Sequence, residues 1–307
     1  MKTDKPLVSI LMNCYNGEKY IAEALDSILA QRYKKYEIIF IDNCSTDNSK
    51  NIANNYPINY FKTEKNIPLG EARNFGLKHC QGEYVAFLDT DDIWLPNTID
   101  TLLTAVCSGD YALAYAGQID INNQGKEIKR YLPKAKQGNF FQDLLYQFDI
   151  PIVCSLISLK HINDRGFSFD ANIHASEEYC LFMQLAVTTE FISLNQALVK
   201  YRVHSDSLTG KTIDKWAEER RYTLNKIIQV NKNISIKYKK AFEEAYARAA
   251  YYEFQFHINK NSYSEARLAI KKHVLVNWKY FIVYLLTWLP KSFWLYLQNI
   301  KYNRGML

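Results

Sequence analysis

The sequence predicts an α/β protein whose N-terminal part is built around a parallel sheet. Over the first 110 residues, short β-rich runs alternate with longer segments of helical apolar spacing, the order that crossover helices between parallel strands produce. Polar side chains follow directly after several of the predicted strands. After residue 210 the segments become long, helical and rich in Tyr and Lys, so we expect a helical region to follow the sheet.

Four apolar runs in the first part predict strands. They are Val8–Asn13, Glu37–Asp42, Ile58–Phe61 and Tyr84–Leu88. Apolar residues at helical spacing, preceded in places by capping residues, predict the helices that follow these strands: Glu18–Ala30, a helix beginning near Asp47, Gly70–Cys80 and a helix beginning at Pro96. This alternation supports the prediction of crossover connections.

The middle of the chain is less regular. Tyr111–Gly117 and Gln118–Ile128 predict two strands around a turn at Asn122–Gly125. Helical spacing then predicts four helices: Phe140–Phe148, Tyr179–Val187, Trp216–Asn231 and Ile236–His257. We place a domain boundary near Gly210, with a catalytic domain over residues 1–210 and a C-terminal helical region over residues 211–307.

Size and charge narrow the class of protein. With 307 residues of which 48% are hydrophobic, the chain can bury a large core, which excludes a disordered protein. Residues 211–307 hold 18 Lys and Arg against 7 Asp and Glu, which leaves 20 against 25 in the preceding part. An acidic first part suits a divalent metal site, and a basic tail suits a surface that faces anionic lipid.

The apolar end of the chain could lie on a membrane. Tyr280–Leu289 and Ser292–Leu297 are apolar but are separated by Pro290 and Lys291, so each is too short to span a bilayer. Trp and Lys residues flank them, as in helices that lie at a membrane interface: Trp278, Trp288, Trp294, Lys271, Lys272 and Lys291. The alternative is a helical hairpin packed on the protein's own core. Interleaved apolar runs argue against nucleic acid as a partner of this tail.

Six isolated cysteines and the N-terminal segment indicate the compartment. No Cys-x-x-Cys pair or zinc-type His spacing occurs, so we expect reduced thiols in a cytoplasmic protein. Met1–Leu11 runs directly into a predicted strand without a secretory apolar stretch. We therefore expect a cytoplasmic location, peripheral on the inner face of the membrane if the tail binds lipid.

The residues after the predicted strands suggest a metal-assisted nucleotide site. Asn13 and Tyr15 follow the first strand, Asp42 ends the second, and Asp89-Thr90-Asp91-Asp92 follows the fourth. Ligands of open α/β sheets bind at these carboxyl ends. Because no Gly-x-Gly-x-x-Gly loop follows the first strand, a diphosphate needs another counter-charge, and Mn²⁺ or Mg²⁺ held by Asp89 and Asp91 would supply it. The alternative for three acids in a turn is solvent exposure and helix capping.

At this point the chain closely resembles the family 2 glycosyltransferases, whose fold is called GT-A. The matching segments occur in the family's order: Val8–Ile10 with Tyr15 and Asn16, Ile41–Asp47, Gly70–Gly76 and Gly82–Asp92. The resemblance implies a Rossmann-like, nucleotide-binding mixed sheet with helices on both faces. It covers about the first 110 residues and extends more weakly to 210.

The resemblance also implies roles for individual residues. Asp42 and Arg73 match the family's contacts to the nucleotide base, with Tyr15 near the ring. Asp89 matches the first acid of the Asp-x-Asp motif, near the ribose, and Asp91 matches its metal-binding acid. We include Asn13 and Thr90 in the expected nucleotide-sugar site. One departure is that the family often has a second Asp and a Gly where this chain has Asn43 and Cys44.

A catalytic base is expected at the start of a later helix. Ser176-Glu177-Glu178 is similar to the family's Glu-Asp motif, whose second acid takes the proton of the acceptor hydroxyl. That position is Glu178 here, with Glu177 as the other candidate. The structural alternative is that both acids only complement the helix dipole.

The segment Tyr201–Ser207 resembles the Arg-x-His segment that closes the catalytic domain in many relatives. His204 is expected to bind the metal or touch the diphosphate, and Arg202 or Ser207 to support the leaving group. The alternative for an isolated histidine is a structural or surface role.

Together these features predict an inverting glycosyltransferase. It would move a sugar from a nucleotide sugar, expected to be a UDP-sugar, to a hydroxyl of a glycan or lipid-linked glycan in one displacement. Two alternatives remain at this stage: a sugar nucleotidyltransferase, for which the early Gly- and basic-rich loop is missing, and a non-catalytic scaffold that binds nucleotide sugar.

Overall fold

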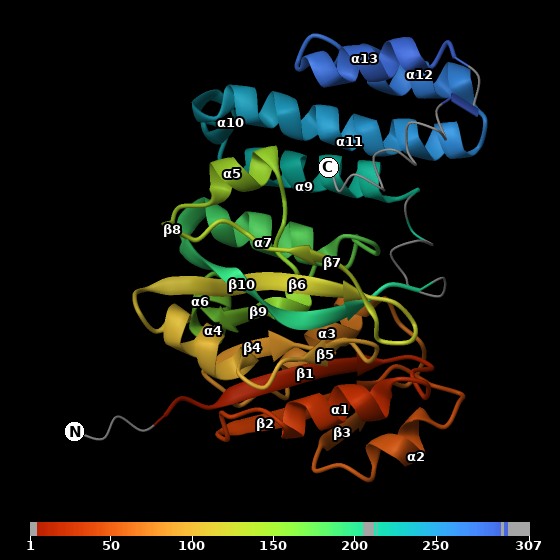
Figure 1. Cartoon of the computed structure of the whole chain (residues 1–307). Helices are drawn as coiled ribbons and strands as arrows, with labels where there is room; N and C mark the ends of the chain where they lie inside the picture. The colour runs from red at the N-terminus through yellow and green to blue at the C-terminus, as the bar shows by residue number, and fades with distance from the viewer. Residues whose placement is uncertain (1–4, 205–211, 213, 290–291, 294–307) are drawn as a thin grey trace. The chain divides into compact units, whose positions relative to one another are not determined.

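The computed structural model describes residues 5–204, 212, 214–289 and 292–293 (Figure 1). The chain folds into two compact units. Unit 1 comprises Met1–Leu144 and Phe148–Ser207, and unit 2 comprises Leu145–Gln147 and Leu208–Leu307. Gly210, where we expected the boundary, lies outside the described residues, so that boundary stays a prediction.

A mixed sheet organises unit 1. Its order is β3-β2-β1-β4-β9-β6-β10-β5, with β7 paired to β6 and β8 paired to β10. The four strands expected at the start are confirmed: β1 (Val8–Cys14), β2 (Tyr36–Asp42), β3 (Asn59–Lys62) and β4 (Tyr84–Phe87). They are mutually parallel, as predicted, with β1 between β2 and β4.

The other half of the sheet contains the antiparallel pairs. The strands are β5 (Ile93–Trp94), β6 (Tyr111–Ile121), β7 (Glu127–Tyr131), β8 (Lys136–Gly138), β9 (Ser155–Ser158) and β10 (Glu190–Arg202). β9 runs antiparallel to both β4 and β6, and β10 runs parallel to β6. The α/β class is confirmed, with a mixed rather than wholly parallel sheet.

The expected turn at Asn122–Gly125 with a strand on each side is confirmed, but the expected break between Gly117 and Gln118 is wrong. β6 runs unbroken through Gly117, and the Asn122–Gly125 turn then leads into β7. The glycine does not end the strand. A Cβ built there would lie 2.0 Å from the Tyr131 carbonyl oxygen, so Gly117 allows the end of β7 to approach β6 closely.

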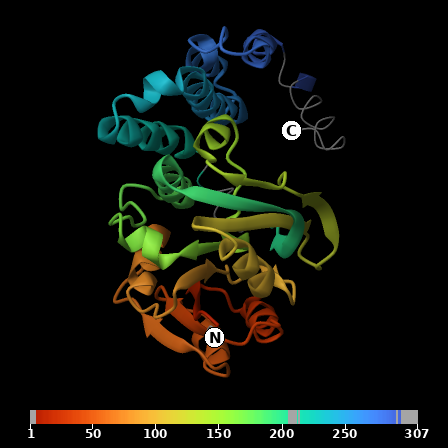
Figure 2. The same ribbon diagram turned by 90° about the vertical axis from the view of Figure 1, so that its left-hand side faces the viewer.

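Helices cover both faces of the sheet in unit 1 (Figure 2). α1 (Ile21–Leu29) and α4 (Thr98–Val106) lie on one face, and α3 (Leu69–Leu77) and α7 (Glu177–Thr188) lie on the other. The remaining helices of unit 1 are short: α2 (Ser49–Ala53), the first part of α5 (Phe141–Tyr146), a 3₁₀ turn (Ile152–Cys154) and α6 (Leu159–Asn163). These helices confirm the expected crossover connections, with ends that differ by a few residues.

β10 has no counterpart among the predicted elements. Its pairing with β6 shifts in register between Leu194 and Ala197 and again before Val199. The polar pair Asn195-Gln196 at this irregularity interrupts the apolar alternation by which a strand is recognised. β10 nevertheless brings Arg202 and His204 to the site described below.

Unit 2 is helical in its described part. Its helices are α9 (Trp216–Val230), α10 (Ile234–Lys237), α11 (Lys239–Asn259), α12 (Tyr263–Lys271) and α13 (Trp278–Leu286). The helix expected over Ile236–His257 is thus two helices, and α12 was not predicted. A small core joins α11, α12 and α13 through Ala247, Ala250, Phe254, Ile258, Ala266, Ile270 and Tyr280. Across the described chain, no helix is long and apolar enough to span a membrane.

Candidate active site

The candidate site lies where three parallel strands of unit 1 end. β1 has β2 on one side and β4 on the other, so the connection after β1 leads toward β2, whereas the connection after β4 leads to strands on the opposite side. This reversal opens a crevice at the carboxyl ends of the strands in folds of this kind. Cys14 and Asp42 are the last residues of β1 and β2, and Asp89 lies two residues beyond β4.

The acidic turn after β4 is packed against the loop after β1. A Cβ at Gly17 would lie 2.9 Å from the Thr90 hydroxyl oxygen and 3.1 Å from the Cys14 sulfur. Only glycine lets the two loops approach so closely. Thr90, which we expected to bind the donor, therefore lies beside the loop that follows β1. Tyr15 belongs to that loop, and Asn13 lies near the end of β1.

Arg73 joins two acids that the sequence places far apart. Its guanidinium donates to Glu177 Oε1 at 2.7 Å and lies 3.4 Å from Asp89 Oδ1. Arg73 is 2% exposed, and its guanidinium lies against the rings of both Phe87 and Phe169. We expected Arg73 at the nucleotide base, but the structure directs its guanidinium to Glu177 and Asp89, and its role toward a base stays a prediction.

Burial and neighbouring acids raise the pKa of the Asp89 carboxyl. Desolvation has the largest effect, and Asp91 and Glu177 add negative potential, which together outweigh the stabilising Arg73 cation. A site that crowds acidic groups in this way favours an added cation.

The two candidate base residues have different surroundings at the start of α7. Glu177 is 4% exposed and holds the ion pair with Arg73, and Gly70 of α3 lies against its side chain. Glu178 is half-buried. Glu177 thus serves as the counter-ion of Arg73, and the choice of Glu178 as base stays a prediction.

Asp91 and His204 are in direct contact. His204 Nε2 lies 2.8 Å from Asp91 Oδ2, and the imidazole packs near the Tyr20 ring at 5.8 Å between centroids. Two of the three expected metal ligands, Asp91 and His204, are therefore adjacent, whereas the third, Asp89, is turned toward Arg73. The attraction of Arg73 and the repulsion between the two aspartates account for this separation.

The pair fits Mn²⁺ or Mg²⁺ that is completed by substrate. Within the described residues, no three His, Cys, Asp or Glu side chains group as a metal cluster. Mg²⁺ in nucleotide enzymes takes only one or two carboxylates from the protein and completes its shell with phosphate oxygens and water. Asp91 with His204 meets that requirement, since a diphosphate would supply further ligands.

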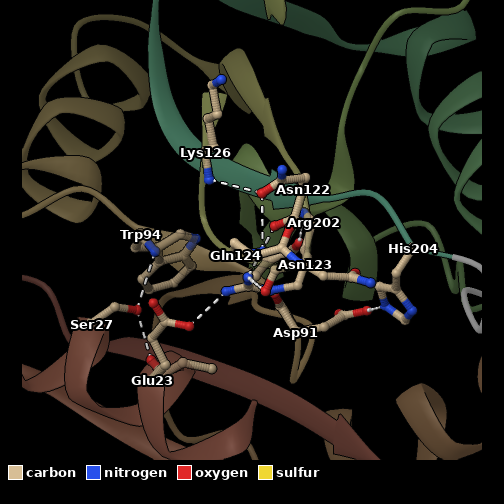
Figure 3. Close-up of polar contacts among 12 residues, drawn as sticks. Glu23, Ser27, Asp91, Trp94, Asn122, Asn123, Gln124, Lys126, Arg202 and His204 are labelled. Atoms are coloured by element: carbon tan, nitrogen blue, oxygen red, sulfur yellow. Dashed lines mark hydrogen bonds and ion pairs between the residues drawn. The ribbon is translucent and has the colours of Figure 1, made fainter. Parts of the chain in front are cut away.

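Arg202 contacts both the acidic turn and α1 (Figure 3). Its Nε donates to the Asp91 carbonyl at 2.9 Å, one terminal nitrogen reaches Glu23 Oε2 at 2.6 Å, and the guanidinium stacks over Tyr20. Figure 3 shows Glu23, Arg202, Asp91 and His204 converging from α1, β10 and the turn. We expected Arg202 to support the leaving group, but its guanidinium is directed to these protein atoms. The alternative, Ser207, lies outside the described residues.

Asp92 is a buried acid that sequence reasoning did not single out. It is 1% exposed, its Oδ1 accepts from the Arg202 backbone N–H at 2.8 Å, and its Oδ2 has no partner in the described structure. Burial, followed by the charges of Asp91 and Asp89, raises the pKa of Asp92 well above its usual value. Its position inside the turn makes it part of the support beneath Asp91.

The expected base-binding side lies at the ends of β1 and β2. Asp42 is 1% exposed and accepts from the Ser45 backbone at 2.7 Å and the Tyr60 hydroxyl at 2.5 Å. The Asn13 amide nitrogen is buried without a partner in the described chain, while Tyr15 is 56% exposed. A buried donor and an exposed ring are the groups that a planar, hydrogen-bonding base can engage.

The departure at Asn43 and Cys44 has a local explanation. The Asn43 amide donates to the Ile67 carbonyl at 2.7 Å and accepts from the Ile67 N–H at 3.0 Å, which fastens the loop before α3. An aspartate could not donate the first bond. Cys44 has φ +62°, the left-handed conformation that favours the glycine often found there in the family.

Comparison with known proteins identifies relatives of the chain. The family model described as "Glycosyl transferase family 2" matches residues 9–162. An "uncharacterized glycosyltransferase" of Rickettsia typhi is 30% identical over 224 residues, covering 70% of this chain and 70% of the relative. The Escherichia coli "UDP-Glc:alpha-D-GlcNAc-diphosphoundecaprenol beta-1,3-glucosyltransferase WfgD" is 27% identical, with coverage of 67% and 81%.

Some relatives are much longer than this chain. An "uncharacterized glycosyltransferase" of Rickettsia felis is 29% identical over 68% of the chain, but that match spans only 35% of the relative. The chain thus spans about a third of the length of such relatives.

Solved structures share the fold. S. aureus TarS 1–349 in complex with UDP-GlcNAc superimposes with a TM-score of 0.63 at 16% identity, covering 87% of this chain and 91% of the other. The mannosyltransferase PcManGT from Pyrobaculum calidifontis, in complex with GDP-Man and Mn²⁺, has a TM-score of 0.55 at 15% identity, with coverage of 93% and 85%. The GT-A fold expected from the motifs is thereby confirmed.

Proposed function

Since this chain belongs to glycosyl transferase family 2, we propose that it transfers a sugar from a nucleoside-diphosphate donor to an acceptor hydroxyl, with inversion at the anomeric carbon. The observation that carries the proposal is the Arg73 bridge. Arg73 contacts both Asp89 of the acidic turn and Glu177, the neighbour of the proposed base, although Glu177 lies 104 positions from Arg73 in the sequence. A donor-binding scaffold without catalysis would have no need to couple these two segments.

For the donor, we propose a UDP-sugar. Asp42 retains acceptor capacity beyond the bonds from Ser45 and Tyr60, so it can accept from the ring N–H of uracil. Tyr15 would stack on the base, and the Asn13 amide would donate to a carbonyl of the base or to a ribose oxygen. Thr90 and Asp89 would face the ribose and the sugar.

For the metal, Asp91 and His204 would hold Mn²⁺ or Mg²⁺. When bound, the cation would neutralise the diphosphate as it departs. Arg202 keeps Asp91 in place through the backbone carbonyl, and Asp92 fixes the Arg202 backbone in return. The contact between Asp91 and His204 supports this assignment, because two candidate ligands already share one position.

For the base, Glu178 would take the proton of the acceptor hydroxyl as that oxygen attacks the anomeric carbon. A single attack from the side opposite the diphosphate inverts the configuration of that carbon. Arg73 holds Glu177 and thereby positions the first turn of α7 and the adjacent Glu178. A half-buried carboxylate can exchange its proton with solvent after each transfer.

For the acceptor, we propose a glycan or lipid-linked glycan at the inner face of the membrane. The E. coli relative is named for a diphosphoundecaprenol-linked acceptor, and a Bacillus subtilis relative is named for teichuronic acid biosynthesis. A peripheral location would bring a cytoplasmic enzyme to such a substrate. The basic and apolar surface of unit 2 supports this location.

The central experiment compares Glu178→Gln with the wild type on a panel of UDP-, GDP- and dTDP-sugars in the presence of Mn²⁺. We expect the wild type to be stabilised against heat by one donor and to hydrolyse it slowly or transfer it. Glu178→Gln should keep the thermal shift and lose transfer. Glu83→Gln is the matched control, because Glu83 is an exposed glutamate at the opposite end of β4.

Two outcomes would contradict the proposal. If none of the nucleotide sugars stabilises the protein against heat, the proposed donor site is wrong. If Glu178→Gln transfers sugar as fast as the wild type, Glu178 is not the base. If Glu177→Gln keeps donor binding but loses transfer, and Glu178→Gln does not, then Glu177 is the base instead of Glu178. A sugar nucleotidyltransferase would instead form a nucleotide sugar from a nucleoside triphosphate and a sugar phosphate, which the same samples can test.

A further inference from the structure

The end of unit 2 exposes apolar side chains that its own core does not use. Ile270 and Tyr280 are buried in the core, but Leu275 is 94% exposed, Leu268 is 69% exposed and Trp278 is 68% exposed. Further exposed apolar residues lie on and after α13: Phe281, Ile282, Leu285, Trp288 and Leu289. Large apolar patches on protein surfaces usually mark an interaction site.

The segment that carries these apolar side chains is rich in positive charge. Residues 260–289 contain five Lys and Arg and a single acid, Glu265. The carboxylate of Glu265 accepts from the Ser264 hydroxyl at 2.7 Å. An apolar surface bordered by cations is complementary to an anionic bilayer. A second copy of the chain fits less well, because a symmetric contact through this face would bring its cations against one another.

A small cavity opens between α12 and the end of α13. It measures about 300 Å³ and is lined by Ser264, Arg267, Leu268, Lys271, Tyr284 and Trp288. The four α12 residues recur at intervals of three and four, so they form one face of that helix. The cavity thus combines two cations, the hydroxyls of Ser264 and Tyr284, and two aromatic rings.

Contacts within the cavity hold Arg267 in a defined place. Its guanidinium lies over the Trp288 ring at 4.3 Å from the centroid, and its Nη1 donates to the Thr287 carbonyl at 3.3 Å. An arginine has five N–H donors, so these contacts leave several for an anion. Arg267 is therefore suited to bind phosphate oxygens, with Lys271 one helical turn away as the second cation.

We infer that this cavity binds the headgroup phosphate of an anionic phospholipid, with Arg267 and Lys271 on the phosphate and Leu268, Leu275 and Trp278 in the adjoining apolar layer. Trp288 and Tyr284, which also line the cavity, would then lie at the membrane–water interface, where aromatic side chains are favoured. The inference rests on the proposed peripheral location, but not on the transferase chemistry.

The test measures binding of the full chain to vesicles without any nucleotide sugar. Vesicles of phosphatidylcholine alone are compared with vesicles that also contain phosphatidylglycerol, by flotation. We expect binding to the anionic vesicles that decreases with added salt. Because each basic residue near the surface contributes to binding, Arg267→Gln/Lys271→Gln should bind roughly thirty-fold more weakly.

The matched control is Lys239→Gln/Lys240→Gln, which removes two exposed cations from the start of α11 in the same unit. It should bind like the wild type. If Arg267→Gln disturbs α13, Lys271→Gln alone keeps the test valid, since this exposed lysine should still account for about fivefold. For the apolar layer, Leu275→Ser should weaken binding, whereas Val230→Ser, at an 85% exposed position, should not.

Several results would overturn the inference. The wild type could bind vesicles with and without phosphatidylglycerol equally well, or Arg267→Gln/Lys271→Gln could bind like the wild type. The control Lys239→Gln/Lys240→Gln could also lose as much binding as the cavity variant. Full competition by inorganic phosphate would indicate a soluble phosphate ligand instead, and self-association through this face would indicate a second copy of the chain. Failure of donor binding in the separate donor assay leaves the vesicle result intact, so the two proposals fail independently.

Discussion

The acidic site of unit 1 and the apolar face of unit 2 place their charged residues in opposite surroundings. In unit 1, Arg73 and Arg202 are each 2% exposed and join segments separated by 104 and 179 positions. In unit 2, the cations near α12 and α13 lie beside solvent and beside apolar side chains that are themselves exposed. The difference teaches that buried charges here fix geometry, whereas exposed charges remain available to a partner.

The largest effect should come from the acid proposed to bind the metal. Asp91→Ala should reduce transfer about a thousandfold or more, because the variant loses the charge that holds the cation on the departing diphosphate. EDTA should do the same to the wild type and should be reversed by Mn²⁺. Steady-state rates measure both. Asp100→Ala, at an exposed acid of α4, is the control, and near-normal turnover of Asp91→Ala would refute the metal assignment.

The next largest effect is on stability, and it tests whether the buried charges of unit 1 need their partners. Arg73→Ala leaves Glu177 buried without its counter-ion and should lower the free energy of unfolding by about 3–5 kcal/mol. Arg130→Ala removes a cation from an ion pair with Glu127 that is exposed on both sides, and should cost far less stability, because solvent screens such a pair. Urea unfolding of both variants measures the difference, and equal costs would show that burial is unimportant at Arg73.

A smaller effect is expected at the base-binding side. Tyr60→Phe leaves one oxygen of the buried Asp42 short of a partner and should cost about 1–3 kcal/mol of stability while weakening donor binding. Tyr56→Phe is matched to it, since Tyr56 donates to the exposed Asp26 at 3.0 Å. Thermal unfolding with and without donor separates the two contributions. Donor affinity unchanged in Tyr60→Phe would mean that Asp42 does not contact the base.

The smallest effect on stability is expected at the exposed apolar face of unit 2. Leu275→Ser should change stability by less than about 0.5 kcal/mol, because its side chain is 94% exposed and leaves no cavity. Ile270→Ala, a few residues earlier but 0% exposed, should cost about 2–5 kcal/mol. Urea unfolding again measures both. A large loss in Leu275→Ser would show that this side chain belongs to the protein's core rather than to a partner's surface.

Much of the fold was predictable because its signals are local. The four parallel strands and their helices follow from apolar runs and helical spacing, and the residues after those strands indicated the site. β10 was missed because Asn195 and Gln196 interrupt its pattern at a register shift. Gly117 was misjudged because a strand glycine that admits a neighbouring carbonyl resembles one that ends a strand.

The sequence by itself determined the α/β class, the family resemblance and the identity of the candidate acids, since these depend on residue type and short spacing. Only the tertiary structure decided which charges meet: Arg73 with Glu177 and Asp89, His204 with Asp91, and Arg202 with the turn beneath them. The physical reason is that the sequence around a charged residue does not indicate which distant residue will pair with it. Partners so far apart along the chain are chosen by burial, which penalises every charge left unpaired.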